Sequence, residues 1–106
     1  MSIKRAPSVE DEPTVTLVEW RVIRTDRGTL HVVGRLAGAL YCRMSSPIKS
    51  FDARQLQGTT TSGRAYRLSG PAGENLNTIR AGLEPELAAA AHGWDDVTDE
   101  VCALRH

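Results

Sequence analysis

Hydrophobic and polar residues alternate through the middle of the chain, a pattern typical of strands that bury one face. One strand begins at Thr14, and a second runs over residues 29–36. Asp26, Arg27 and Gly28 between them suit a three-residue hairpin loop, because aspartate opens turns and glycine adopts positive φ. The core-facing residues of this hairpin are predicted to be Val18, Trp20, Val22, Leu30, Val32 and Leu36.

Glycine and proline indicate where the sheet bends and where strands stop. Gly34 lies inside the second strand and predicts a bulge or a sharp bend at that point. A third strand is expected over residues 40–44. Residues 48–51 are expected to form an edge strand, because Pro47 is tolerated at the start of such a strand.

A second hairpin is predicted from residues 59–61 and 64–68, with Ser62 and Gly63 in the turn between them. Threonine favours strands, and the second of these segments alternates in polarity. The chain thus predicts a strongly bent antiparallel sheet of about five strands. Because the strands bend within a small sheet, we expect a partly open small barrel.

Helical spacing replaces strand alternation after the second hairpin. Leu76, Ile79 and Leu83 share one face of a short predicted helix, and a second helix begins at Pro85. Residues 95–104 fit either a helix or an edge strand. The predicted core is completed by Ile79, Leu83, Leu87 and Trp94.

The composition describes a single globular unit. The 106 residues are 41% hydrophobic and 25% charged, which suits one ordered domain. We expect an α+β domain over residues 14–106 with one or two C-terminal helices, behind a flexible N-terminal arm over residues 1–13. No apolar run approaches the ~20 residues that cross a bilayer, and the arm has no apolar stretch of the secretory type. We therefore expect a cytoplasmic protein with no membrane partner.

Charge is divided unevenly along a chain whose formal net charge is zero. Residues 19–67 hold nine basic and three acidic side chains, whereas residues 74–106 hold two basic and seven acidic ones. One interpretation is a cationic sheet face that binds a polyanion. The other is that the acidic tail folds against the sheet and the two fields largely cancel.

Catalytic and metal-binding patterns are weak. His31 is interpreted as a residue on a strand surface, and neither it nor Cys42 stands in a recognisable nucleophile motif. Cys42 and Cys102 lack metal-ligand spacing and are expected to be reduced thiols. We therefore expect a protein that is not an enzyme and needs no cofactor or metal. A small enzyme that uses His31 or Cys42 is kept as an alternative.

The most informative polar residues lie in two short segments, the Ser-Ser-Pro corner at residues 45–47 and the Thr-Ser-Gly bend at residues 61–63. If the second hairpin pairs near that corner, hydroxyl and guanidinium groups converge on one rim. Such groups suit recognition of phosphate or carboxylate. The other interpretation is that these residues serve turns and sheet surfaces. The predicted rim consists of Arg43, Ser45, Ser46, Lys49, Thr61, Ser62, Arg64, Tyr66 and Arg67.

The same segments carry a resemblance. Residues 45–48 and the pattern from Thr61 to Gly70 resemble small uncharacterised proteins encoded in proteobacterial genomes and prophages, over residues 18–73. The resemblance implies a bacterial, phage-derived accessory protein, and it assigns no functional residue.

Three functional classes follow from these observations. The first is a non-enzymatic binding or regulatory module that engages a protein or other macromolecule through the predicted rim. The second is a protein that associates with itself through its oppositely charged regions. The third is a nucleic-acid-binding accessory protein that uses the cationic sheet.

Overall fold

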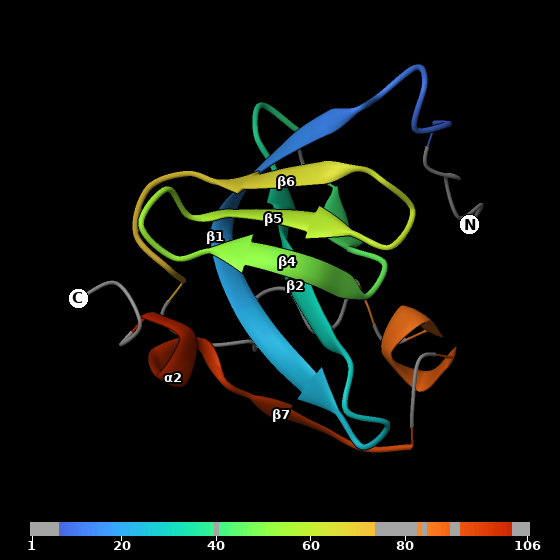
Figure 1. Cartoon of the computed structure of the whole chain (residues 1–106), viewed down its shortest axis with the longest axis vertical. Coiled ribbons are helices and arrows are strands. Elements are labelled where there is room, and N and C mark those ends of the chain that lie inside the picture. The colour runs from blue at the N-terminus through green and yellow to red at the C-terminus, as the bar shows by residue number, and fades with distance from the viewer. Residues whose placement is uncertain (1–6, 40, 74–82, 84, 90–91, 103–106) are drawn as a thin grey trace.

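The computed structural model describes residues 7–39, 41–73, 83, 85–89 and 92–102. These residues form an α+β domain that consists mostly of sheet (Figure 1). Leu83 and residues 85–89 are helical. The remaining elements are β1 (Thr14–Thr25), β2 (Leu30–Leu36), β3 (Cys42–Met44), β4 (Ile48–Asp52), β5 (Gln57–Thr60), β6 (Ala65–Leu68), β7 (Trp94–Asp96) and α2 (Thr98–Cys102).

Strand β1 organises the sheet, whose order is β3-β2-β1-β6-β5-β4. One edge of β1 pairs with β2 in an antiparallel ladder. Its other edge pairs first with β6, in parallel over Thr14–Leu17, and later with β7, antiparallel over Ile23–Thr25. A long central strand can accept different partners along one edge because each residue offers its own hydrogen-bonding groups. Strands β6 and β7 thus dock at opposite ends of β1.

A bulge in β1 sets the bend of the sheet. The register with β2 shifts between Val18 and Arg21, and Glu19 has a φ of 52°. Gly34 of β2 faces the bulge, where an added Cβ would lie 3.1 Å from the Cα of Trp20. A bulge bends its strand and increases its twist, so the glycine allows the two backbones to approach. The predicted bulge is thus present in the β1–β2 pair, but it lies in β1, opposite Gly34, rather than in the second strand.

Two apolar clusters lie on opposite faces of β1 and β2, because successive strand residues point to opposite sides. Val22 and Val32 belong to the larger cluster, which Tyr66 and Leu68 of β6 also enter. The neighbouring residues Ile23 and Val33 pack with Leu83 and Leu87 of the helical segment. Strands β4–β6 therefore fold across one face of β1 and β2, as Figure 1 shows, and the helical segment covers the other.

The structure corrects several predictions about the sheet. The described residues form seven strands rather than about five, and the β1–β6 pair is parallel rather than antiparallel. Strand β4 approaches β2, but the described strands end at β3 and β4 without closing a barrel. The sheet stays open because β3 and β4, which residues 45–47 connect, pair with different strands: β3 pairs with β2, and β4 pairs with β5.

The predicted core needs one clear correction, at Val18. The bulge shifts the alternation of β1, so that Leu17 is buried in the place that a regular strand would give to Val18. Leu30 and Leu36 pack at the border of the larger cluster, and Ile79 lies outside the described residues. The remaining predicted core residues are buried or packed against a cluster, and they are Trp20, Val22, Val32, Leu83, Leu87 and Trp94.

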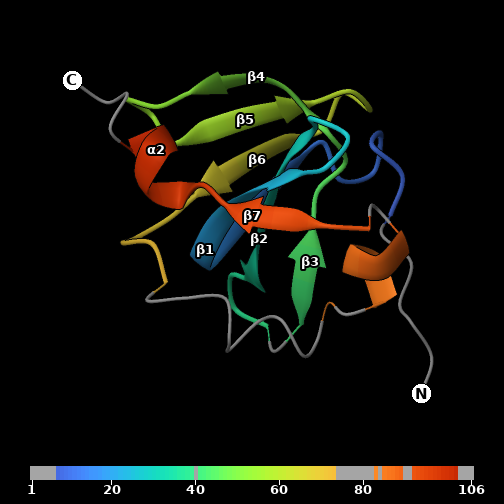
Figure 2. The ribbon, with the colours of Figure 1, turned by 90° about the horizontal axis from the view of Figure 1, so that it is seen from below.

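Residues 95–104, for which the sequence fitted either a helix or an edge strand, contribute to both. Residues Trp94–Asp96 form the edge strand β7, and Thr98–Cys102 form α2 directly after it (Figure 2). Val97 and Val101 from this segment join the larger cluster. Among the other tail predictions, Leu76 lies outside the described residues.

Candidate functional site

The two polar corners of the sequence lie side by side. The backbone N–H of Thr61 donates to the carbonyl of Pro47 at 2.9 Å, which joins the Ser-Ser-Pro corner to the turn between β5 and β6. That turn is closed by a 2.9 Å hydrogen bond from the N–H of Thr60 to the carbonyl of Arg64. Gly63 has a φ of 94°, a conformation that glycine adopts without steric cost. The predicted proximity of the two corners is therefore confirmed.

Four residues of the predicted rim are exposed at this junction. Ser46 belongs to one corner, Thr61 and Ser62 belong to the other, and Lys49 follows in the irregular start of β4. The hydroxyls of Ser62 and buried Thr60 are 2.8 Å apart, which orients the Ser62 side chain. We call these four exposed residues, Ser46, Lys49, Thr61 and Ser62, the corner surface.

Three other residues of the predicted rim lie elsewhere. The hydroxyl of Ser45 is buried, where it accepts from the N–H of Val32 at 3.0 Å and donates to the carbonyl of Ser46. Tyr66 belongs to the larger apolar cluster. Arg67 is exposed on β6, between Thr16 of β1 and Gln57 of β5. Strand alternation explains the last two placements, because Tyr66 and Arg67 face opposite sides of β6.

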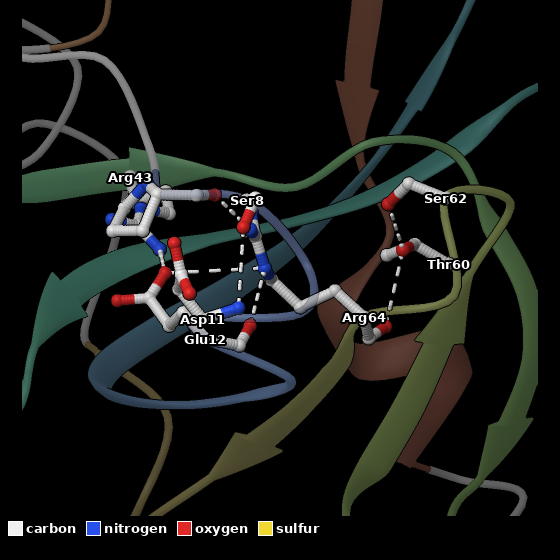
Figure 3. A network of polar contacts seen from close by, with 8 residues as sticks. Ser8, Asp11, Glu12, Arg43, Thr60, Ser62 and Arg64 are labelled. Atoms are coloured by element: carbon white, nitrogen blue, oxygen red, sulfur yellow. Dashed lines mark hydrogen bonds and ion pairs between the residues drawn. The ribbon is translucent and has the colours of Figure 1, made fainter.

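The last two rim residues, Arg43 and Arg64, converge on one carboxylate. Figure 3 shows both guanidinium groups directed at Glu12. We call Glu12, Arg43 and Arg64 the Glu12 cluster. Arg43 Nη1 pairs with the Glu12 carboxylate, and Arg64 Nε lies 3.9 Å from the same oxygen. The arginine side chains are 15% and 9% exposed, against 28% for Glu12. Two mostly buried cations thus share one carboxylate.

The backbone of the arm completes this cluster. Arg64 Nε donates to the carbonyl of Glu12 at 2.8 Å, and its Nη2 donates to the carbonyl of Pro7. The arm forms a single turn here, in which the N–H groups of Asp11 and Glu12 both donate to the carbonyl of Ser8. Residues 7–13 therefore contact the sheet through Arg64, while the predicted flexibility of residues 1–13 stays a prediction.

Glu12 was not among the predicted site residues. The signal for it was the acidic run at residues 10–12, which precedes β1 in a chain whose sheet region is rich in arginine. Opposite charges of this kind favour contact between the two segments. Which of the three acids makes that contact depends on the turn at Ser8, and this turn is not visible in the sequence pattern.

A shallow depression of about 240 Å³ lies on the β4–β5 side of the sheet. It is lined by Ser50, Phe51, Asp52, Gln55, Gln57 and Thr59. Hydroxyl, amide and carboxylate groups dominate this lining, and neither His31 nor Cys42 belongs to it.

His31 is buried rather than on a strand surface, so its predicted placement is wrong. Its ring is 5% exposed and is held at both nitrogens. Nδ1 donates to the carbonyl of Ser45 at 2.8 Å, and Nε2 lies 2.9 Å from the hydroxyl of Thr29. Ladder pairing with Ile23 carries His31 inward, so the histidine links β2 to the Ser-Ser-Pro corner.

Cys42 and Cys102 are free thiols, as expected. Partial burial raises the pKa of the Cys42 thiol, against the opposing field of Arg35, and nearby Glu19 raises it further. A raised pKa disfavours the nucleophilic thiolate.

A second carboxylate cluster joins the acidic tail to the centre of β1. Arg21 Nε donates to Asp96 at 2.8 Å, and its Nη1 donates to the carbonyl of Gly73 at 2.8 Å. Asp96 also accepts from the hydroxyl and the N–H of Thr98. The Thr98 hydroxyl in turn accepts from the N–H of Val22 at 2.9 Å. We call Arg21, Asp96 and Thr98 the Asp96 lock.

These bonds determine the acidity of Asp96. Partial burial alone would raise the pKa of its carboxyl, but the hydrogen bonds from Arg21 and Thr98 outweigh burial and hold the pKa below the ordinary value. Arg24 additionally pairs with Glu100 of α2 at 3.6 Å. The acidic tail therefore neutralises part of the cationic sheet, as the second interpretation of the charge pattern expected.

Within the described ranges, no cluster of three or more histidine, cysteine, aspartate or glutamate side chains could hold a metal ion. No helix in the same part of the chain is long and apolar enough to span a membrane.

Comparisons with protein-family models, curated proteins and solved structures found no match for this chain. The resemblance to proteobacterial and prophage-encoded proteins stays a prediction.

Proposed function

We propose that this chain is a non-enzymatic binding module that engages a protein partner through the corner surface. The observation that carries the proposal is the hydrogen bond from Thr61 to Pro47, because it joins two exposed polar corners that are far apart in sequence. Hydroxyls on short, fixed turns offer directional hydrogen bonds at little entropic cost. Lys49 adds one exposed positive charge beside them.

The distribution of ion pairs favours a protein partner over a nucleic acid. Arg21, Arg24, Arg35 and Arg43 all form ion pairs with carboxylates of the same chain. Nucleic-acid affinity depends on cations that are available to neutralise phosphates. With Arg64, five of the nine basic side chains of residues 19–67 thus face carboxylates of the same chain, which leaves fewer cations for phosphates.

We place this activity in the cytoplasm of a bacterium, in an accessory protein of phage origin. The proposal rests on the sequence resemblance over residues 18–73. The enzyme alternative is not proposed, because His31 is enclosed by Thr29 and Ser45 and the pKa of Cys42 is raised.

Site-specific photocrosslinking in cells tests the proposal. A photoreactive amino acid placed at Ser62 should give an adduct of one discrete mass, and charge reversal by Lys49→Glu should abolish it. The matched control places the same group at Asp26, an exposed residue in the β1–β2 loop, and pairs it with Arg27→Glu. Equal adducts from Ser62 and Asp26, or none from either, would contradict the proposal. An adduct at twice the mass of the chain would instead support self-association.

A further inference from the structure

We infer that Arg43 and Arg64 form a receptor for the carboxylate of a short acidic peptide segment, and that the chain's own arm occupies this receptor until a partner's segment displaces it. The inference rests on the proposed function and adds to it the chemistry of the partner and a mode of regulation. It begins from the pairing of two arginines with one glutamate (Figure 3).

The charge of the cluster shows which ligand it accepts. Arg43 and Arg64 supply two guanidinium groups at 15% and 9% exposure, whereas Glu12 supplies one carboxylate. Arg43 makes a charge-assisted hydrogen bond to that carboxylate, a contact about twice as strong as a neutral hydrogen bond, and Arg64 adds its charge from 3.9 Å. Removal of the carboxylate leaves two like charges close together without a counter-charge, an arrangement that another anion stabilises. The site therefore selects an anion.

The backbone contacts show that the anion is part of a peptide. Arg64 donates to two main-chain carbonyls, from Nε to that of Glu12 and from Nη2 to that of Pro7. Any peptide offers such carbonyls, and the single turn of the arm places two of them around one guanidinium. The arm makes that turn through Ser8, whose hydroxyl accepts from the N–H of Asp11 at 3.2 Å. The expected ligand is a one-turn segment that ends in glutamate or aspartate.

The arm sits at the edge of the corner surface, which makes exchange useful for binding. The backbone of Arg64 closes the turn that carries Thr61 and Ser62, and Val9 of the arm would lie 3.9 Å from a Cβ placed on Gly63 of that turn, so a ligand in place of the arm borders the turn. The arm continues directly into β1, where the N–H of Ala65 donates to the carbonyl of Pro13. Because the arm is joined directly to β1, its effective concentration at Arg43 and Arg64 is in the millimolar range. A free segment therefore competes poorly with the arm unless Glu12 is removed.

Peptide binding to the full chain tests the inference. The probe is a fluorescent peptide with the sequence of residues 7–13, measured by polarisation against the wild type and against Glu12→Gln. We expect the variant to bind the peptide at least about tenfold more tightly, because its own arm no longer supplies the competing carboxylate. A peptide that carries the same Glu12→Gln change should not bind. The matched protein control is Glu10→Gln, which removes an exposed acid of the same arm and should behave as the wild type.

Equal affinity of the wild type and the Glu12→Gln protein for the peptide, or no binding to either protein, overturns the inference. A second measurement, by NMR, uses the wild type and so does not depend on the folding of Glu12→Gln. Peptide at about ten millimolar, above the effective concentration of the arm, should shift the side-chain N–H signals of Arg43 and Arg64 saturably. Unchanged signals overturn the inference. The crosslink from Ser62 is read independently, so it can succeed where the peptide experiment fails.

Discussion

The Asp96 lock and the Glu12 cluster use the same groups in different settings along β1. In both, a carboxylate meets guanidinium and an arginine binds a main-chain carbonyl. The lock is connected to the ladder itself, because Thr98 accepts from the N–H of Val22 in the middle of β1. The Glu12 cluster instead holds a segment that precedes β1 and contributes no residue to either apolar cluster.

The difference shows that the role of an ion pair depends on whether the backbone beside it is hydrogen-bonded within the sheet. Opening the Asp96 lock leaves the buried N–H of Val22 without its partner, so the lock opens only with the sheet around it. Opening the Glu12 cluster lifts one turn of arm from the surface, and the strands stay paired. The first is a structural contact, and the second has the properties of an exchangeable one.

The largest expected effect comes from Arg21→Met. The change removes the donors to both Asp96 and Gly73 and leaves a partly buried carboxylate unpaired. We expect the free energy of unfolding to fall by about 3 kcal/mol, as measured by urea denaturation. The matched control is Arg24→Met, which breaks the exposed 3.6 Å pair with Glu100 and should cost within about 0.5 kcal/mol. Equal losses in the two variants would contradict the assigned role of the lock.

A smaller loss is expected from Thr98→Val. Valine fills the same volume, but it leaves the buried N–H of Val22 without an acceptor. The free energy of unfolding should fall by about 2 kcal/mol. Thr98→Ser keeps the hydroxyl and should recover most of this loss. If serine and valine are equally destabilising, packing rather than the hydrogen bond explains the role of Thr98.

Glu12→Gln should have a still smaller effect on stability. Arg43 and Arg64 lose their counter-charge, but the arm can move away and water can reach both guanidinium groups. We expect a loss of about 1 kcal/mol in the free energy of unfolding. A loss as large as that of Arg21→Met would show that the arm is as structural as the lock.

The smallest effect concerns pH. Because the folded-state pKa of Asp96 lies below its ordinary value of 3.8, the carboxylate stabilises the fold above that pH. This contribution is lost as the pH falls below 3.8 through the lowered folded-state pKa. Asp96→Asn should flatten the acid side of a stability–pH curve, measured by thermal unfolding. An unchanged slope would show that Asp96 contributes no pH dependence.

The hairpins could be predicted because their signals are local. Asp26 to Gly28 forms the expected loop, in which the N–H of Gly28 donates to the carbonyl of Thr25. The second turn is also where the pattern placed it, but it includes Thr61, which was predicted to be in the strand. The parallel pairing of β1 with β6 could not be predicted, since it joins residues about fifty positions apart with no connecting pattern. Long-range partners are chosen by packing rather than by local propensity.

The position of the candidate site could be predicted from the sequence, but the residues that form it could be predicted only in part. Both polar corners came together, yet Ser45 is buried against β2 and Arg64 is buried beneath the arm. Their burial follows from β2–β3 pairing and from the arm, and polarity alone gives no sign of either. Glu12 was missed because its partners, Arg43 and Arg64, lie 31 and 52 residues away. The bulge at Glu19 likewise moved Leu17 into the core in place of Val18.

Native-state hydrogen exchange compares the two clusters in one experiment. The N–H of Val22 donates to Thr98 in the lock, and the N–H of Glu12 donates to Ser8 in the arm. If the arm opens while the sheet stays folded, Glu12 should exchange at least about a hundredfold faster than Val22 after correction for intrinsic rates. Equal protection of the two amides would show that arm and sheet open together, and the arm could then not give way to a partner.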